Sequence, residues 1–115
     1  MTIASLLEPV TGQPGPARLT HAADWMQGRT LYGGASALVA YTMATRAFSG
    51  LPPLRAGQIA FVAPVGEEIA LSAEIIRQGR NVTQVRSEII SDGKVALSAF
   101  WLFAEGREAN ALHPA

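Results

Sequence analysis

Apolar and polar residues alternate with a period of two along much of the second half of the chain. Residues 68–75 place an apolar side chain at every second position, which predicts a strand with one buried face. Residues 84–89 show the same alternation, whereas residues 95–103 are apolar at nearly every position and predict a strand covered on both faces. The Asp92-Gly93 pair is typical of a hairpin turn between the last two strands. These strands are therefore expected to form an antiparallel meander.

A different period marks the middle of the chain. Between residues 31 and 48, apolar residues recur at helical spacing, and the opposite face is also almost uncharged. The regular stripe consists of Leu31, Ala35, Leu38, Val39, Thr42, Met43 and Ala47. A helix that is apolar nearly all round is normally buried, here in the concavity of a sheet. Gly50 and the Pro52-Pro53 pair end this helix.

The remaining segments complete the expected architecture. Residues 18–25 are expected to form a short first strand and residues 54–64 a further strand after the helix. Residues 1–17, with their prolines and glycines, are expected to be an irregular lead-in, and residues 106–115 a flexible tail. One strand, one long helix and four strands predict a single α+β domain over residues 1–115, with an antiparallel sheet wrapped around the helix.

Composition narrows the classes of partner. Hydrophobic residues make up 49% of the 115 residues and charged residues 16%, which is typical of a globular domain. Nine basic and nine acidic residues cancel, which argues against a nucleic-acid partner, because such binding needs a clustered excess of Lys and Arg. No apolar run approaches the roughly 18 residues that span a bilayer, and no signal-peptide pattern opens the sequence. We expect a cytoplasmic protein without a membrane partner.

Composition also limits the chemistry. The chain has no Cys, which excludes thiol catalysis and disulfides, and its two His residues lie far apart in the sequence. A metal site is therefore not expected. The sequence has no phosphate-binding loop of the Walker type and no serine-centred nucleophile elbow.

Two consecutive glycines, Gly33 and Gly34, stand at the start of the expected helix. Because they lack a Cβ, a ligand can approach the backbone closely there. The N–H groups of a first helical turn have no acceptor within the helix, and the helix dipole adds partial positive charge. Such amides can hold a carbonyl oxygen that is becoming an oxyanion. The alternative is that the glycines only allow tight packing of the helix against a strand.

Two stretches carry a resemblance to a known family. Residues 27–34 read Gln-Gly-Arg-Thr-Leu-Tyr-Gly-Gly before an Ala-rich helix, and residues 77–82 read Arg-Gln-Gly-Arg-Asn-Val in a turn. They resemble the hotdog-fold acyl-CoA thioesterases, above all the N-terminal repeat of the acyl-CoA thioesterase II type, which has Phe-Gly-Gly before its helix and Arg-x-Gly-Arg-Ser in a later turn. The resemblance runs from about Asp24 to Phe103. It implies a hotdog fold and hydrolysis of an acyl-CoA thioester to a carboxylic acid and CoA.

The resemblance also implies roles for particular residues. An amide of Gly33 or Gly34 would polarise the thioester carbonyl, and the later turn would contact the phosphates of CoA. The substrate-binding residues that it implies are Tyr32, Gly79, Arg80 and Asn81. An arginine suits a phosphate because its planar fork of donors matches the phosphate oxygens; the alternative for Arg80 is an ordinary solvated hairpin residue. No cofactor is implied, since CoA is part of the substrate.

The chain departs from the family at the catalytic acid. Many single-hotdog thioesterases carry His-Gly-Gly and an acid about two turns into the helix, but here Tyr32 replaces the His, and Tyr41 and Thr42 occupy the later positions. In two-hotdog relatives the catalytic Asp, Thr and Gln lie in a second repeat, which the present sequence lacks. Asp24 and Gln27 are therefore the candidates for activating water, or, for Asp24, for attacking the thioester directly. The alternatives are a turn or capping role for Asp24 and a structural role for Gln27.

Three classes of function stay open from the sequence. Acyl-CoA hydrolysis leads, a non-catalytic acyl-CoA-binding hotdog module is the alternative, and a hotdog hydratase or dehydratase would need His21 as its base. Because residues 95–103 are apolar on both faces and relatives fuse two hotdogs, we expect a homodimer or homotetramer with equivalent sites at the interface. Phe100, Trp101 and Phe103 belong either to the core or to an acyl tunnel.

Overall fold

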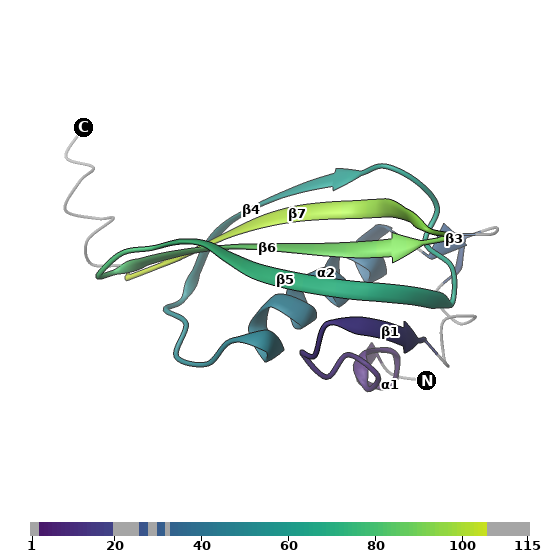
Figure 1. Ribbon diagram of the computed structural model, residues 1–115, viewed down its shortest axis with the longest axis horizontal. Coiled ribbons are helices and arrows are strands. Elements are labelled where there is room, and N and C mark those ends of the chain that lie inside the picture. Colours follow the sequence, from purple (N-terminus) through teal and green to yellow (C-terminus); the bar gives the residue numbers. More distant parts are fainter. Residues whose placement is uncertain (1–2, 20–25, 28–29, 32, 106–115) are drawn as a thin grey trace.

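A five-stranded antiparallel sheet and one long helix form the body of the molecule (Figure 1). The structure, a computed structural model, describes residues 3–19, 26–27, 30–31 and 33–105. In chain order the elements are α1 (Ile3–Leu7), β1 (Gly15–Arg18), β2 (Met26–Gln27), β3 (Thr30–Leu31), α2 (Gly33–Ala47), β4 (Leu54–Phe61), β5 (Glu68–Gln78), β6 (Val82–Ser91) and β7 (Lys94–Ala104). The sheet has the order β1-β5-β6-β7-β4, while β2 and β3 form a separate hairpin.

The expected α+β architecture is confirmed in its main parts. Strands β5, β6 and β7 pair consecutively as an antiparallel meander, and β4 adds to the far side of β7. The hairpin between β6 and β7 turns at Asp92 and Gly93, whose φ angles are 55° and 74°. A two-residue turn with both central residues in the left-handed region fits the twist of the flanking strands. α2 lies within the helix predicted over residues 31–48.

The core lies between α2 and one face of the sheet. Alternate side chains of β6 and β7 are buried on this face, namely Thr83, Val85, Ser87, Ile89, Ser91, Leu97, Ala99, Trp101 and Phe103. The buried side of α2 consists of Ala35, Ser36, Val39, Ala40, Thr42, Met43 and Ala44. Most of these helix residues are small, so α2 approaches the sheet closely.

One buried polar chain ties α2 to the sheet. The Ser87 hydroxyl donates a hydrogen bond to the carbonyl oxygen of Ala40 at 2.8 Å. The indole Nε1 of Trp101 donates in turn to the Ser87 hydroxyl at 2.9 Å. The Trp101 ring also meets the Tyr41 ring edge to face, with centroids 5.2 Å apart. These contacts give the buried Ser87 hydroxyl and the Trp101 indole N–H their hydrogen-bond partners and fix the Trp101 ring.

The N-terminal segment differs from the expected irregular lead-in. It contains α1 and then β1, which pairs with β5 so that Gly15 lies opposite Leu71. The first strand of the sheet therefore covers residues 15–18 instead of 18–25, and residues 20–25 lie outside the described residues. Pro16 is compatible with this strand because β1 is at the edge of the sheet, where a missing N–H is tolerated.

Long-range contacts hold this N-terminal segment in place. Leu6 and Val10 are fully buried against the rest of the core. Arg46, in the last turn of α2, donates from Nη1 to the carbonyl oxygens of Leu7 at 2.8 Å and Val10 at 2.9 Å. Such contacts join residues far apart in sequence, so the local pattern of residues 1–17 gave no sign of them.

The sheet is covered by helix on one face only. On the other face Phe100 is 47% exposed and Leu102 is half-buried, so the single chain leaves this face of residues 95–103 partly uncovered, and its expected cover by a second subunit stays a prediction. Trp101 and Phe103 belong to the core. Strand β4 is the terminal strand beside β7, and of its residues only Ile59 is partly buried.

Candidate active site

The start of α2 lies at one end of the molecule, directly after the β2–β3 hairpin (Figure 1). Gly33 and Gly34 are the first two residues of the helix, and Gly34 is exposed. The first turn contains no acidic side chain to offset the positive end of the helix dipole. The predicted position of the two glycines is thus confirmed, and their amides belong to the turn that has no acceptor within the helix.

Within the described ranges, neither packing nor backbone conformation explains a glycine at position 33. Its φ angle is not in the left-handed region that favours glycine. A β-carbon on Gly33 would meet, among the described residues, only the Phe61 ring, 3.7 Å from Cε1 and 3.8 Å from Cζ. Such distances are ordinary van der Waals contacts, whereas a β-carbon on Gly57 would lie 2.7 Å from Cζ3 of Trp101. Tight packing against a strand therefore accounts for Gly57 and not for Gly33.

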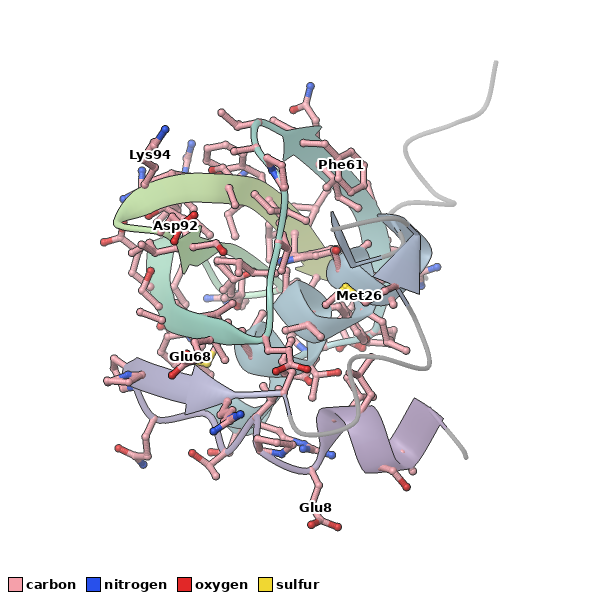
Figure 2. All side chains as sticks on the ribbon, turned by 90° about the vertical axis from the view of Figure 1, so that its right-hand side faces the viewer. Glu8, Met26, Phe61, Glu68, Asp92 and Lys94 are labelled. Atoms are coloured by element: carbon pink, nitrogen blue, oxygen red, sulfur yellow. The ribbon has the colours of Figure 1, made fainter. Side chains whose placement is uncertain are left out.

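Phe61 is a neighbour of the helix start that the sequence did not reveal. It is the last residue of β4, and its side chain is 60% exposed. Figure 2 looks onto this end of the molecule and shows Phe61 together with Met26 of the β2–β3 hairpin. No periodicity connects Phe61 with Gly33, because their contact depends on the order of the strands in the sheet.

The turn between β5 and β6 forms a second candidate region. The amide of Gly79 donates to the carbonyl oxygen of Val82 at 2.7 Å, which closes the turn. The turn borders a shallow pocket of about 300 Å³, lined by Arg77, Gly79, Arg80, Asn81, Val82 and Gln84. Two arginines, Arg77 and Arg80, thus line one pocket, and arginine is the residue type suited to an anionic group such as a phosphate.

The single chain does not bring these two regions together. β4 begins at Leu54, which pairs with Phe103, and Phe103 pairs with Thr83 close to the β5–β6 turn. β4 ends at Phe61, beside the start of α2. The turn and the helix start therefore lie at opposite ends of the sheet, as Figure 1 shows.

The side chains of four residues with predicted roles are not placed: Asp24 and Gln27 for water activation, Tyr32 for substrate binding, and His21 as the base of a hydratase. Asp24, Tyr32 and His21 lie outside the described residues. Gln27 lies in β2, where its backbone pairs with Thr30 just before α2, but its side chain is outside the described part of the structure. Their proposed roles therefore stay predictions.

The helix positions that carry an acid in many relatives are occupied by core residues. The ring of Tyr41 packs on Trp101 and stacks with Phe103 at a centroid distance of 6.3 Å, and Thr42 is buried. α2 contains no carboxylate. Over the described ranges, no group of three or more His, Asp or Glu side chains is arranged to hold a metal ion. No helix in the described part of the chain is both long and apolar enough to cross a membrane.

Comparison with known protein families identifies the family to which this chain belongs. The sequence model of the family described as acyl-CoA thioesterase N-terminal domain matches residues 21–104. The chain belongs to this family. The expected resemblance to the hotdog acyl-CoA thioesterases is thereby confirmed. No curated protein matches the sequence.

Solved structures show the same fold for this thioesterase-family domain. A thioesterase II candidate from Thermobifida fusca has a TM-score of 0.75 and 18% identity, over 90% of this chain and 39% of that one. A hotdog-fold protein of unknown function from Alicyclobacillus acidocaldarius has a TM-score of 0.72 and 18% identity, over 91% of this chain and 40% of that one. A Bacillus halodurans protein solved with CoA has a TM-score of 0.64 and 20% identity, over 77% of this chain and 65% of that one.

The chain is much shorter than the first two of these structures, spanning 39% and 40% of their lengths. At identities of 18% to 20% the likeness establishes the hotdog fold. The thioesterase-family domain is thus a sheet wrapped around one helix, as the sequence pattern predicted.

Proposed function

We propose that this domain hydrolyses an acyl-CoA thioester to a carboxylic acid and CoA, with the thioester carbonyl held by the amides of Gly33 and Gly34. The observation that carries the proposal is the glycine at position 33, at the first turn of α2, which neither its φ angle nor its contacts with the described residues require. An open backbone at the positive end of a helix suits an oxygen that gains negative charge during attack. Membership of the acyl-CoA thioesterase family supports this choice of chemistry.

The β5–β6 turn is the proposed site for the CoA phosphates. Arg80 would supply a guanidinium fork, and Gly79 and Asn81 would let the nucleotide approach the backbone of the turn. Support comes from the open pocket around these residues. In the Bacillus halodurans neighbour, the solved structure contains CoA, which is consistent with a CoA thioester as the substrate class.

A second copy of the chain is the proposed partner, bound through β4. β4 is a terminal strand with a single charged residue, Arg55, and no proline, so its free edge is open to pairing. The other side of the sheet is better protected, because β1 covers the beginning of β5 and a bulge lies between Ile75 and Arg77. The large apolar residues exposed along β4 and directly after it are Leu54, Phe61 and Val62.

Pairing through β4 would also reunite the two halves of the site. In an antiparallel, two-fold pair, the beginning of one β4 lies beside the end of the other. The β5–β6 turn of one protomer would then lie at the same end as the helix start of its partner. Size-exclusion chromatography with light scattering should give a dimer or tetramer, and a clean monomer at micromolar concentration contradicts the shared site.

Water activation is assigned to Asp24 and Gln27. In this proposal a carboxylate takes the proton of the attacking water, or attacks the thioester itself, and the amide of Gln27 orients the water. Their place in the sequence, ahead of the helix start, supports the assignment. Thiol release should fall by at least about a hundredfold in Asp24→Ala, the usual lower range for a general base. Full turnover in both Asp24→Ala and Gln27→Ala would refute this choice of residues.

The decisive experiment compares Gly33→Ala with Gly66→Ala. At both positions an added β-carbon meets only ordinary contacts, since on Gly66 it would lie 3.7 Å from the Ser91 hydroxyl. Free-thiol release from short, long and aromatic acyl-CoAs should fall at least about tenfold in Gly33→Ala. It should stay at the native rate in Gly66→Ala. Equal rates in the two variants would remove the main support for the carbonyl site.

One observation favours a second candidate function. α2 contains no carboxylate, so the domain has no acid at the helix position used by many relatives. A hotdog module that binds acyl-CoA without turnover fits that observation. Calorimetric binding of CoA by a protein that releases no thiol from any acyl-CoA in the panel would favour the binding module over the hydrolase.

A further inference from the structure

Phe61 is held rigidly at the end of β4, although its side chain is largely exposed. Its backbone pairs with Leu97 of β7, which is fully buried. Directly after it, the amides of Val62 and Ala63 both donate to the carbonyl oxygen of Ala96, at 2.8 Å and 3.1 Å. The chain therefore cannot move the Phe61 backbone away from β7 without breaking these bonds.

The Phe61 side chain points to the helix side of the sheet without joining the core. Residues paired across two strands share a face, so Phe61 lies on the same face as the buried Leu97. Ile59, two residues earlier on that face, packs against the core, whereas Phe61 is 60% exposed. The ring atoms Cε1 and Cζ instead face Gly33, 3.7 Å and 3.8 Å from the place that a β-carbon on this residue would take. An aromatic ring that can bury about 150–250 Å² is thus left open at the rim of the helix start.

We propose that Phe61 determines acyl specificity by forming the wall against which the acyl group packs. The inference rests on the proposed function, because it takes the carbonyl site to be the amides of Gly33 and Gly34. The Phe61 ring lies within 3.8 Å of the place of a β-carbon on Gly33, so an acyl group that extends past Gly33 from a carbonyl bound there can pack on the ring. A chain of several methylenes, or an aromatic acyl group, can cover this ring, whereas an acetyl group is too short to do so.

The matched control is Phe100, the other exposed phenylalanine of the same pair of strands. It lies on β7, is 47% exposed, and occupies the opposite face of the sheet, away from α2. Phe61→Ala and Phe100→Ala each remove a phenylalanine side chain, and the two side chains are exposed to a comparable degree. Only the first removes a group beside the helix start. Phe61→Leu keeps an apolar side chain and serves as the conservative variant.

The experiment measures kcat/KM by thiol release from acetyl-CoA, hexanoyl-CoA and benzoyl-CoA, with the oligomeric mass of each protein followed by light scattering. Phe61→Ala should lower kcat/KM about tenfold for hexanoyl-CoA and benzoyl-CoA, since one apolar contact in a hydrophobic site contributes about this much discrimination. Acetyl-CoA should be nearly unaffected. Phe61→Leu should recover part of the hexanoyl rate, and Phe100→Ala should match the native protein.

Two results overturn the proposal. One is a Phe61→Ala protein with the native preference among the three substrates. The other is an equal loss on all three together with a fall in oligomeric mass, which would make Phe61 an interface residue only. If the native protein releases no thiol, the proposed hydrolysis fails, and binding affinities for hexanoyl-CoA and CoA are measured instead. The acyl wall is supported if the native protein binds hexanoyl-CoA more tightly than CoA and Phe61→Ala loses this preference. No such preference, or one unchanged in the variant, overturns it.

Discussion

The two ends of α2 are built for different purposes. At its C-terminal end, Arg46 uses its side chain to bind the carbonyl oxygens of Leu7 and Val10, and Gly12 packs against the Arg46 carbonyl. At its N-terminal end, the Phe61 ring is the only described group near the missing β-carbon of Gly33, and Gly34 is exposed. One end is closed by the chain itself, and the other is left open.

Glycine serves a different role at each end. Gly12 has a φ of 90°, and a β-carbon there would lie 2.3 Å from the carbonyl oxygen of Arg46, so the fold requires a glycine at this position. Gly33 has no such requirement. Packing and backbone conformation thus explain Gly12, whereas the described residues do not explain Gly33, which stands at the first turn of α2.

The largest expected effect is at the closed end. Gly12→Ala combines a left-handed backbone with a clash against backbone atoms that cannot turn away. We expect a loss of about 3 kcal/mol or more in the free energy of unfolding, measured by urea denaturation with circular dichroism. Gly50→Ala is the matched control, because Gly50 also has a positive φ of 73° but nothing within 4 Å of an added β-carbon. Its loss should be only about 1–2 kcal/mol, and equal losses would show that the clash with Arg46 is relieved.

A smaller effect is expected from Arg46→Ala. This change removes the hydrogen bonds to the carbonyl oxygens of Leu7 and Val10 and a cation from the last turn of α2. Because the Arg46 side chain is exposed, we expect a loss of about 1–2 kcal/mol in the same assay. Arg46→Lys should recover less than half of it, since lysine keeps the charge without the planar fork. An unchanged unfolding midpoint in Arg46→Ala would mean that packing alone holds the N-terminal segment.

The smallest effect on stability is expected at the open end. Gly33→Ala should change the free energy of unfolding by no more than about 0.5 kcal/mol, because alanine suits a helix and meets only ordinary contacts. The same variant is expected to lose thiol release, so stability and activity should separate there. A large loss of stability in Gly33→Ala would remove the distinction between the two ends.

The sequence was sufficient for the parts of the fold that repeat locally. The period of two predicted the meander of β5, β6 and β7, the helical spacing predicted α2, and the Asp92-Gly93 pair predicted the last hairpin. It was insufficient for α1 and β1, which are placed by contacts with α2 and β5 far along the chain. An apolar strand indicates that both faces of β7 avoid water and does not say which chain covers them, so the expected cover of the second face by a partner stays a prediction.

The residues of the candidate site also differ in how far the sequence alone can predict them. Gly33 and Gly34 could be predicted because the start of a helix is a local feature with known chemistry. Phe61 could not be predicted, because its contact with Gly33 follows from β4 pairing with β7 at the edge of the sheet. Asp24 and Gln27 stay predictions, since the structure does not describe their side chains.

The docking of the N-terminal segment bears on the order of folding. Residues 3–18 find their places only on elements that follow them in the chain, since α1 contacts the end of α2 and Gly15 pairs with Leu71. Loop closure over such separations is slow compared with hairpin formation, so the local meander is expected to precede it. Residues 3–18 are therefore among the last parts of this domain to be secured, and until then β5 presents an unpaired edge to neighbouring chains.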